Sequence, residues 1–229
     1  MKSYTASILM IVCLSLFPLH AFSSEADHQS TSELVRTIKN IKDKEKTLKT
    51  FIATFQQVKK SQLLREPLKS EGLIYFDISG KILIKVFHPS LLTLLLKDNM
   101  QVIYYPDLAK AEKKILGIST ENILSKYFGI GQSIEAMQKQ FEISLGNKIS
   151  SVGYHLNMIP KNAVTARHVD MIEVVVNQKN GLPEQIYIKE KQGDHTAIKL
   201  DYKSINEPLP PAIFSIELPK ETKNIEEER

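Results

Sequence analysis

The side chains that could do acid–base or metal chemistry are scattered along this sequence. A metal site or a general base would need two histidines, or a histidine beside a carboxylate or cysteine, at a short spacing. The chain has six histidines, and no two of them stand at such a spacing. They are His20, His28, His88, His155, His168 and His195. We therefore expect no catalytic residues, no metal ligands and no cofactor.

Motifs that activate a nucleophile are also missing. The only cysteine is Cys13, and the sequence contains neither a G-x-S-x-G turn nor a phosphate-binding glycine loop. The stretch Ser79-Gly80-Lys81 fits a hairpin turn better than a serine–lysine dyad. The sequence therefore disfavours an enzyme such as a hydrolase and favours a non-enzymatic protein.

Residues 1–23 have the pattern of a cleavable signal peptide. Lys2 precedes an apolar run from Ile8 to Leu19, and small and polar residues follow from Ala21. This run is shorter than the roughly 18–20 apolar residues of a spanning helix. We expect export to the periplasm with cleavage between about Ala21 and Glu25, and an uncleaved membrane anchor is the alternative. Cys13 lies inside the run without a small residue before it, so we interpret it as part of the signal.

The charge balance gives no support for a nucleic-acid partner, and we expect none. The formal net charge is +4 and the two signs are mixed along the chain, which is too weak a basic character for nucleic-acid binding. Without Cys13 the exported chain would have no disulfide, and a domain of about 200 residues can be held together by its core. We expect a monomer, with a weakly basic surface that could meet an anionic membrane or an acidic partner.

Helical and strand periods divide the rest of the chain. Ser30 and Glu33 have the spacing of a capping box, and Leu34, Ile38 and Ile41 continue at helical period, which predicts an amphipathic helix. From about Thr50 the period becomes two. Small or apolar side chains alternate with polar ones in 68–76, 82–86, 172–176, 185–189 and 198–201.

This alternation is typical of an antiparallel sheet with one apolar and one solvated face. Turn residues separate the strands at Ser79-Gly80, Asp98-Asn99, Asn180-Gly181 and Gly193-Asp194. Two helices, Glu121 to Phe128 and Ser133 to Gln140, are predicted between the two groups of strands. Their apolar residues either fill the concave side as a core or cap it as a lid.

The C-terminal part is expected to end the domain. Prolines in 207–211 predict an extended loop, and Phe214 to Leu218 predicts a short closing strand. Residues 220–229 are charged and are expected to form a disordered tail. We thus predict a signal peptide (1–23), one domain (24–219) and a tail (220–229).

An ordered series of motifs resembles the LolA-type carriers of outer-membrane lipoproteins. The series runs through almost all of the chain after residue 50, and each motif alone is loose. It comprises Phe51, Phe55, Gln56 and Gln57; Glu66-Pro67-Leu68, Ser70 and Gly72; Gly80-Lys81, Pro89 and Asp98-Asn99; Leu156-Asn157-Met158-Ile159-Pro160; Asn180-Gly181-Leu182-Pro183; Gly193-Asp194-His195-Thr196; and Asn206 before Phe214.

The resemblance implies a half-open barrel, mainly β with α, whose helices cover a concave apolar cavity for acyl chains. It implies a periplasmic carrier that is loaded by an inner-membrane lipoprotein-releasing transporter and unloaded to an outer-membrane receptor. The expected lining is Phe51, Phe55, Ile74, Phe76, Ile84 and Val86 from the strands, with Ile123, Tyr127, Phe128 and Met137 from the lid.

Other functions on the same fold stay open. The cargo could be a glycolipid or another acylated molecule, or the protein could be a sensor of mislocalised lipoproteins that controls a membrane partner. The chain also departs from many relatives, because Leu83-Ile84 occupy the place of their Arg-Trp pair and the chain has no tryptophan. If that arginine closes the lid in relatives, this chain must close it differently, and Arg65 is the nearest substitute along the chain.

Overall fold

A curved, open sheet forms most of the protein. The computed structural model describes residues 25–116, 133–146 and 153–227. The strands are β1 (Thr50–Lys60), β2 (Leu68–Asp77), β3 (Lys81–His88), β4 (Leu92–Lys97), β5 (Met100–Tyr105), β6 (Lys110–Ile115), β7 (Phe141–Leu145), β8 (Gly153–Pro160), β9 (Val169–Asn177), β10 (Pro183–Glu190), β11 (His195–Ile205) and β12 (Lys223–Glu227).

The helices are α1 (Glu25–Glu45), α3 (Ile134–Gln140) and the single turn α4 (Ala163–Ala166), with 3-10 turns η1 (Pro106–Leu108), η2 (Lys191–Gly193) and η3 (Pro211–Phe214).

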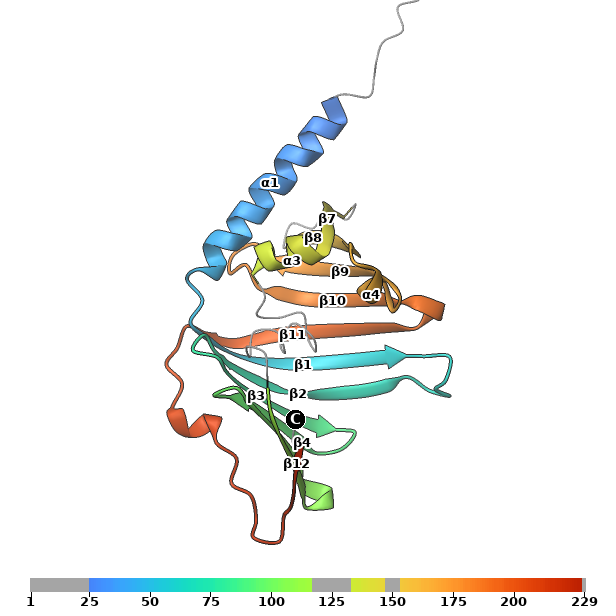
Figure 1. The fold of residues 1–229 in the computed structure, drawn as a ribbon. Coiled ribbons are helices and arrows are strands. Elements are labelled where there is room, and N and C mark those ends of the chain that lie inside the picture. The colour runs from blue at the N-terminus through green and yellow to red at the C-terminus, as the bar shows by residue number, and fades with distance from the viewer. Residues whose placement is uncertain (1–24, 117–132, 147–152, 228–229) are drawn as a thin grey trace, which may run out of the picture.

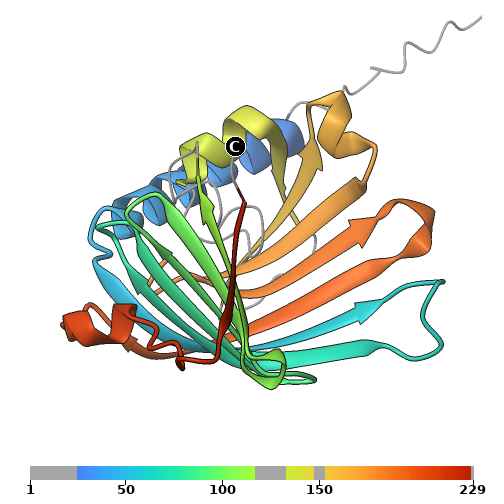
Figure 2. The same cartoon turned by 60° about the horizontal axis from the view of Figure 1, so that its bottom comes forward.

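The strand order places β12 and β7 at the two ends of the sheet. It runs β12-β6-β5-β4-β3-β2-β1-β11-β10-β9-β8-β7, so the first and the eleventh strand pair at its centre. Every pairing among β1 to β11 is antiparallel, whereas β12 is parallel to β6. The sheet curves without closing, and α1 and α3 lie on its concave side (Figures 1 and 2). The predicted fold class is confirmed.

The predicted turns are confirmed as well. Asp98 and Asn99 have φ of 52° and 59°, the left-handed pair that a two-residue hairpin requires. Gly80 has a φ of 90°, and its N–H donates to the Asp77 carbonyl oxygen at 3.0 Å. Gly181 and Gly193 also have positive φ.

Helix α1 packs on the sheet through one face, as its period predicts. Ile41 is buried, and Leu34 and Ile38 pack against the same hydrophobic cluster. The helix begins at Glu25, five residues before the predicted cap at Ser30. The expected capping box is therefore wrong as a helix start.

The sheet is buried on both faces at β3 to β5. Leu83, Leu95 and Val102 point away from α1 and α3, and they form a second hydrophobic cluster with Phe214 of η3. The prediction that one face is solvated is wrong for this part of the sheet, because residues after β11 cross it. The inner cluster and this outer cluster together enclose β3 and β4.

The C-terminal expectations need correction. Residues 215–218 form no strand, and Lys223–Glu227, expected to be disordered, pair with β6 as β12. The register of β12 runs from Lys223 opposite Lys110 to Glu227 opposite Lys114. A charged composition alone was therefore a poor guide to disorder at this sheet edge.

Of the two predicted internal helices, one lies among the described residues and can be compared with the structure. The helix at Ser133–Gln140 is confirmed as α3, and the Ser133 hydroxyl caps it by accepting from the Ala136 N–H. The helix predicted at Glu121 to Phe128 lies outside the described residues.

Candidate functional site

The inner face of the sheet gathers the strand residues that the sequence predicts as a lining. We use "inner face" for the sheet face that packs against α1 and α3. Five of the predicted residues are buried in one cluster with Met137 of α3, and Val86 is half-buried against it. The five are Phe51, Phe55, Ile74, Phe76 and Ile84.

Strand register brings these residues side by side. Phe51 pairs with Phe76, and Ile74 pairs with Ile84, which continues to Leu94 on β4. The Phe51 and Phe76 rings stack at a centroid distance of 4.9 Å, an arrangement that adds to the burial of each ring. The alternation in the sequence thus becomes continuous apolar rows across β1 to β4.

The same face continues over the second half of the sheet. The site prediction left these residues out, although the alternation in 172–176, 186–188 and 198–200 marks those of β9 to β11. The buried ones are Leu156, Met158, Val174, Val176, Ile186, Ile198 and Leu200, with Ile82, Leu94 and Leu96 from the first half. The apolar surface therefore extends from β4 to β8.

Tyr202 closes one end of this face. Its ring and the Phe51 ring pack in a T-shaped arrangement with their centroids 5.3 Å apart. The Tyr202 hydroxyl donates a hydrogen bond to the Pro183 carbonyl oxygen at 2.9 Å. Burial raises the pKa of Tyr202 far above its ordinary value, so the hydroxyl stays neutral and keeps this bond.

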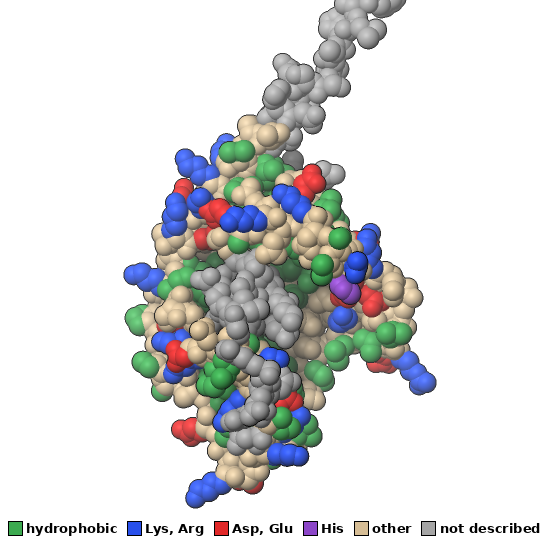
Figure 3. All heavy atoms as spheres, viewed as in Figure 1, with side chains coloured by type: hydrophobic (Ala, Val, Ile, Leu, Met, Phe, Trp, Pro, Cys, Tyr) green, Lys and Arg blue, Asp and Glu red, His purple; other side chains and the backbone are tan. Residues whose placement is uncertain are grey.

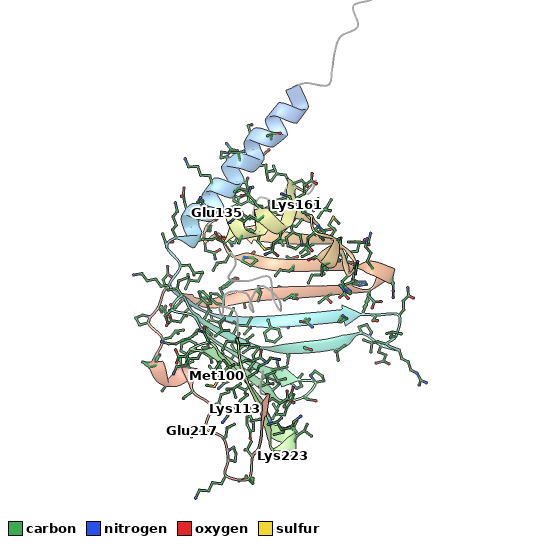
Figure 4. The ribbon with its side chains drawn as sticks, in the orientation of Figure 1. Met100, Lys113, Glu135, Lys161, Glu217 and Lys223 are labelled. Carbon is green, nitrogen blue, oxygen red and sulfur yellow. The ribbon has the colours of Figure 1, made fainter. Side chains whose placement is uncertain are left out.

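Three side chains of α1 connect the helices to one another and to the sheet. Glu45 accepts a hydrogen bond from the Ile134 N–H at 3.2 Å, and Lys42 forms an ion pair with Glu135 of α3. Glu135 lies at the end of α3 next to α1 (Figure 4). Asn40 donates from Nδ2 to the Tyr154 hydroxyl on β8 at 2.7 Å.

These links were not expected from the sequence. No pattern along the chain pairs residues 42–45 with residues 134–135, since tertiary packing alone brings them together. At the positions where many relatives have Arg-Trp, Ile84 belongs to the inner face and Leu83 to the outer cluster. Arg65 is exposed in the β1–β2 turn.

Burial of Glu45 predicts a dependence of stability on pH. Desolvation raises its pKa from 4.5 to about 7, and the Ile134 N–H opposes the shift. The folded protein thus holds this proton to a higher pH than the unfolded chain, and loses stability as the pH rises from about 4.5 through 7. For a partly solvated group, the loss is about 1–2 kcal/mol.

We expect Glu45→Gln to keep the acceptor and remove the charge. Urea denaturation should show the variant stabilised by about 1–2 kcal/mol at pH 8 relative to wild type, with little difference at pH 5. Glu142→Gln, at an exposed position on β7, is the control and should show no such pH difference. An equal effect of Glu45→Gln at both pH values would contradict the assignment.

The predicted lid is described only in part. Met137 is buried against the inner face from α3, whereas Ile123, Tyr127 and Phe128 lie outside the described residues. Helix α3 buries two side chains, Ile134 and Met137.

Within residues 25–116, 133–146 and 153–227, no group of three histidine, cysteine or acidic side chains could hold a metal ion. Among the same residues, no helix combines the length and apolar character needed to cross a bilayer.

Comparison with solved structures identifies the fold. A conserved protein from Thermus thermophilus superposes with a TM-score of 0.56 at 9% identity, over 85% of this chain and 99% of that one. MucB superposes with a TM-score of 0.51 at 10% identity, over 81% of this chain and 63% of MucB. A LolA superfamily protein from Nitrosomonas europaea gives 0.43 at 10% identity, over 80% and 97%.

At these identities the two likenesses with TM-scores above 0.5 show the fold alone. Among curated proteins, none matches this chain. The model of the family described as "Outer membrane lipoprotein carrier protein LolA" matches residues 46–217, from just before β1 to just after η3. Since this match spans most of the chain and every strand except β12, the protein belongs to the LolA family.

Proposed function

We propose that the protein is a periplasmic carrier that binds the acyl chains of lipoproteins against its inner face and carries them from the inner to the outer membrane. The observation that carries this proposal is the continuous apolar face, reaching from β4 to β8 and meeting two helices, in a chain of the LolA carrier family. The family's carrier role also favours a binding protein over an enzyme.

The energetics of acyl burial support the proposal. Each methylene removed from water contributes about 0.8 kcal/mol, so an acyl chain of roughly 15 carbons gains about 12 kcal/mol. Ile134 and Met137 of α3 are the side chains that this helix buries. Re-exposing two such side chains costs about 3–6 kcal/mol. An entering acyl chain can therefore outweigh displacement of α3 from the sheet.

The test compares one change on the inner face with one on the outer face of the same strand. Val86 is half-buried on the inner side, so Val86→Asp can fold while placing a charge beside the bound chain. Lys85→Asp changes an exposed neighbour on the opposite face. We expect Val86→Asp to weaken binding of a fluorescent fatty-acyl probe more than tenfold and Lys85→Asp to leave it unchanged.

Denaturation curves must first show that both variants fold. Folded Val86→Asp that binds the probe as well as wild type would remove this face from the site. Native mass spectrometry of the protein purified from the periplasm would then identify what it carries. A lipoprotein would support the proposal, whereas a glycolipid would keep the mechanism and change the cargo.

The second candidate is the alternative left open by the sequence, a sensor of mislocalised lipoproteins that controls a membrane partner. MucB, which has also been solved in a complex with MucA, shares the fold. This chain spans 63% of MucB. A stable complex with a membrane-bound signalling protein, isolated under the same conditions, would favour the sensor over the carrier.

A further inference from the structure

Exposed apolar side chains gather at one edge of the sheet. We call it the turn edge: it holds the β1–β2, β3–β4, β5–β6, β8–β9 and β10–β11 connections, as the strand pairings require. Leu63 and Leu64 are exposed in the β1–β2 turn, Phe87 and Leu91 flank the β3–β4 turn, and Leu108 is exposed on η1. Such residues concentrated at one end of a domain indicate a contact surface.

The β1–β2 turn presents its leucines outward from a fixed base. The Ser61 hydroxyl and the Gln62 N–H donate to the Asp194 carboxylate at 2.6 and 3.0 Å, and Gln62 Nε2 donates to the Gln192 carbonyl oxygen at 2.6 Å. The polar side chains at the base of the turn thus bind the β10–β11 connection. Leu63, at 93% exposed, meets solvent.

Basic residues surround these leucines. Lys60, Arg65 and Lys69 are exposed around Leu63, Leu64 and Leu68, and the acidic residue between them is Glu66. Figure 3 shows hydrophobic side chains beside basic ones at the end of the molecule where β1 and β2 turn.

Leucine with lysine and arginine is the composition of segments that lie in an anionic bilayer surface. Protein interfaces, in contrast, are depleted in lysine and rich in aromatic residues.

We propose that the turn edge docks on an anionic phospholipid bilayer, with the leucines of the β1–β2 turn entering the headgroup region. This inference goes beyond the carrier function and does not depend on acyl binding, since it concerns the edge of the sheet rather than its inner face. Attraction of each nearby cation to an anionic surface strengthens binding about fivefold. The leucines add the apolar contribution that makes a surface contact persist.

The chain has no tryptophan, so one introduced indole reports on its own surroundings. Leu63→Trp is compared with Ile78→Trp, an exposed apolar position at the opposite edge of the sheet. With vesicles of phosphatidylcholine containing phosphatidylglycerol, we expect a blue shift of indole emission from the Leu63→Trp variant and none from the Ile78→Trp variant. An equal shift for both, or none for either, would overturn the proposal.

Binding is then measured by vesicle flotation of protein purified from the periplasm. Leu63→Asp/Leu64→Asp should bind at least tenfold more weakly than wild type. Ile78→Asp/Met100→Asp, which changes exposed apolar residues of the opposite edge, should bind like wild type. All variants have the same N-terminus. Any contribution of the apolar run 8–19 to vesicle binding is therefore equal in each variant and cancels when they are compared.

A separate pair of variants tests how much the basic side chains contribute to vesicle binding. Lys60→Gln/Arg65→Gln/Lys69→Gln should lose about 100-fold on anionic vesicles. The triple change of Lys85, Lys199 and Lys220 to glutamine, at exposed positions outside the turn, should lose far less. Equal losses in the two triple variants would show general attraction of a basic protein and would overturn docking by this edge.

Discussion

Phe214→Ala should lower the free energy of unfolding by about 3–5 kcal/mol. Phe214 is 2% exposed and packs on Leu83, Leu95 and Val102 at the outer face of the sheet. Alanine would leave a cavity there and loosen η3, which holds the chain between β11 and β12 on this face. Urea denaturation followed by circular dichroism measures the loss.

Glu217→Ala is the matched control, because Glu217 is exposed three residues further along the same segment. It should change the stability by less than about 0.5 kcal/mol. An unchanged denaturation midpoint for Phe214→Ala would mean that residues after β11 do not stabilise the sheet. The second hydrophobic cluster would then contribute nothing to the folded state.

The outer cluster shows how far alternation in the sequence can be trusted. Alternating residues in β2 and in β9 to β11 correctly predicted a sheet with an apolar inner face. Leu94-Leu95-Leu96 is a continuous apolar run instead, and so is Ile82-Leu83-Ile84 within the stretch 82–86 that we interpreted as alternating. Such runs indicate strands buried on both faces. The runs were visible in the sequence, but nothing local showed that Phe214 covers them.

The polar links of the helices could not be predicted for a related reason. Charges spaced by three or four residues interact within one helix, whereas Lys42 meets Glu135 and Glu45 meets Ile134 only after α3 packs beside α1. The raised pKa of Glu45 has the same origin, because burial by distant parts of the chain causes it. The apolar lining follows from local periodicity, but the contacts that hold a helix over it do not.

Gly72→Ala should destabilise the protein by at least about 3 kcal/mol. An added Cβ would lie 1.9 Å from the Lys85 carbonyl oxygen and 2.7 Å from Phe55 Cε1. The first obstacle is main chain, at the place where the β2–β3 register shifts between Glu71 and Gly72. Gly146→Ala is the control, since the nearest atom to its added Cβ is His155 Cβ at 3.2 Å.

The double variant Gly72→Ala/Phe55→Leu separates the two obstacles. Leucine removes the ring that Gly72 faces across β1 and β2 but leaves the Lys85 carbonyl oxygen in place. We therefore expect the double variant to be no more stable than Gly72→Ala, when each is measured by urea denaturation. Recovery to the stability of Phe55→Leu alone would contradict this, and would mean that Gly72 is needed to seat an aromatic ring on the inner face.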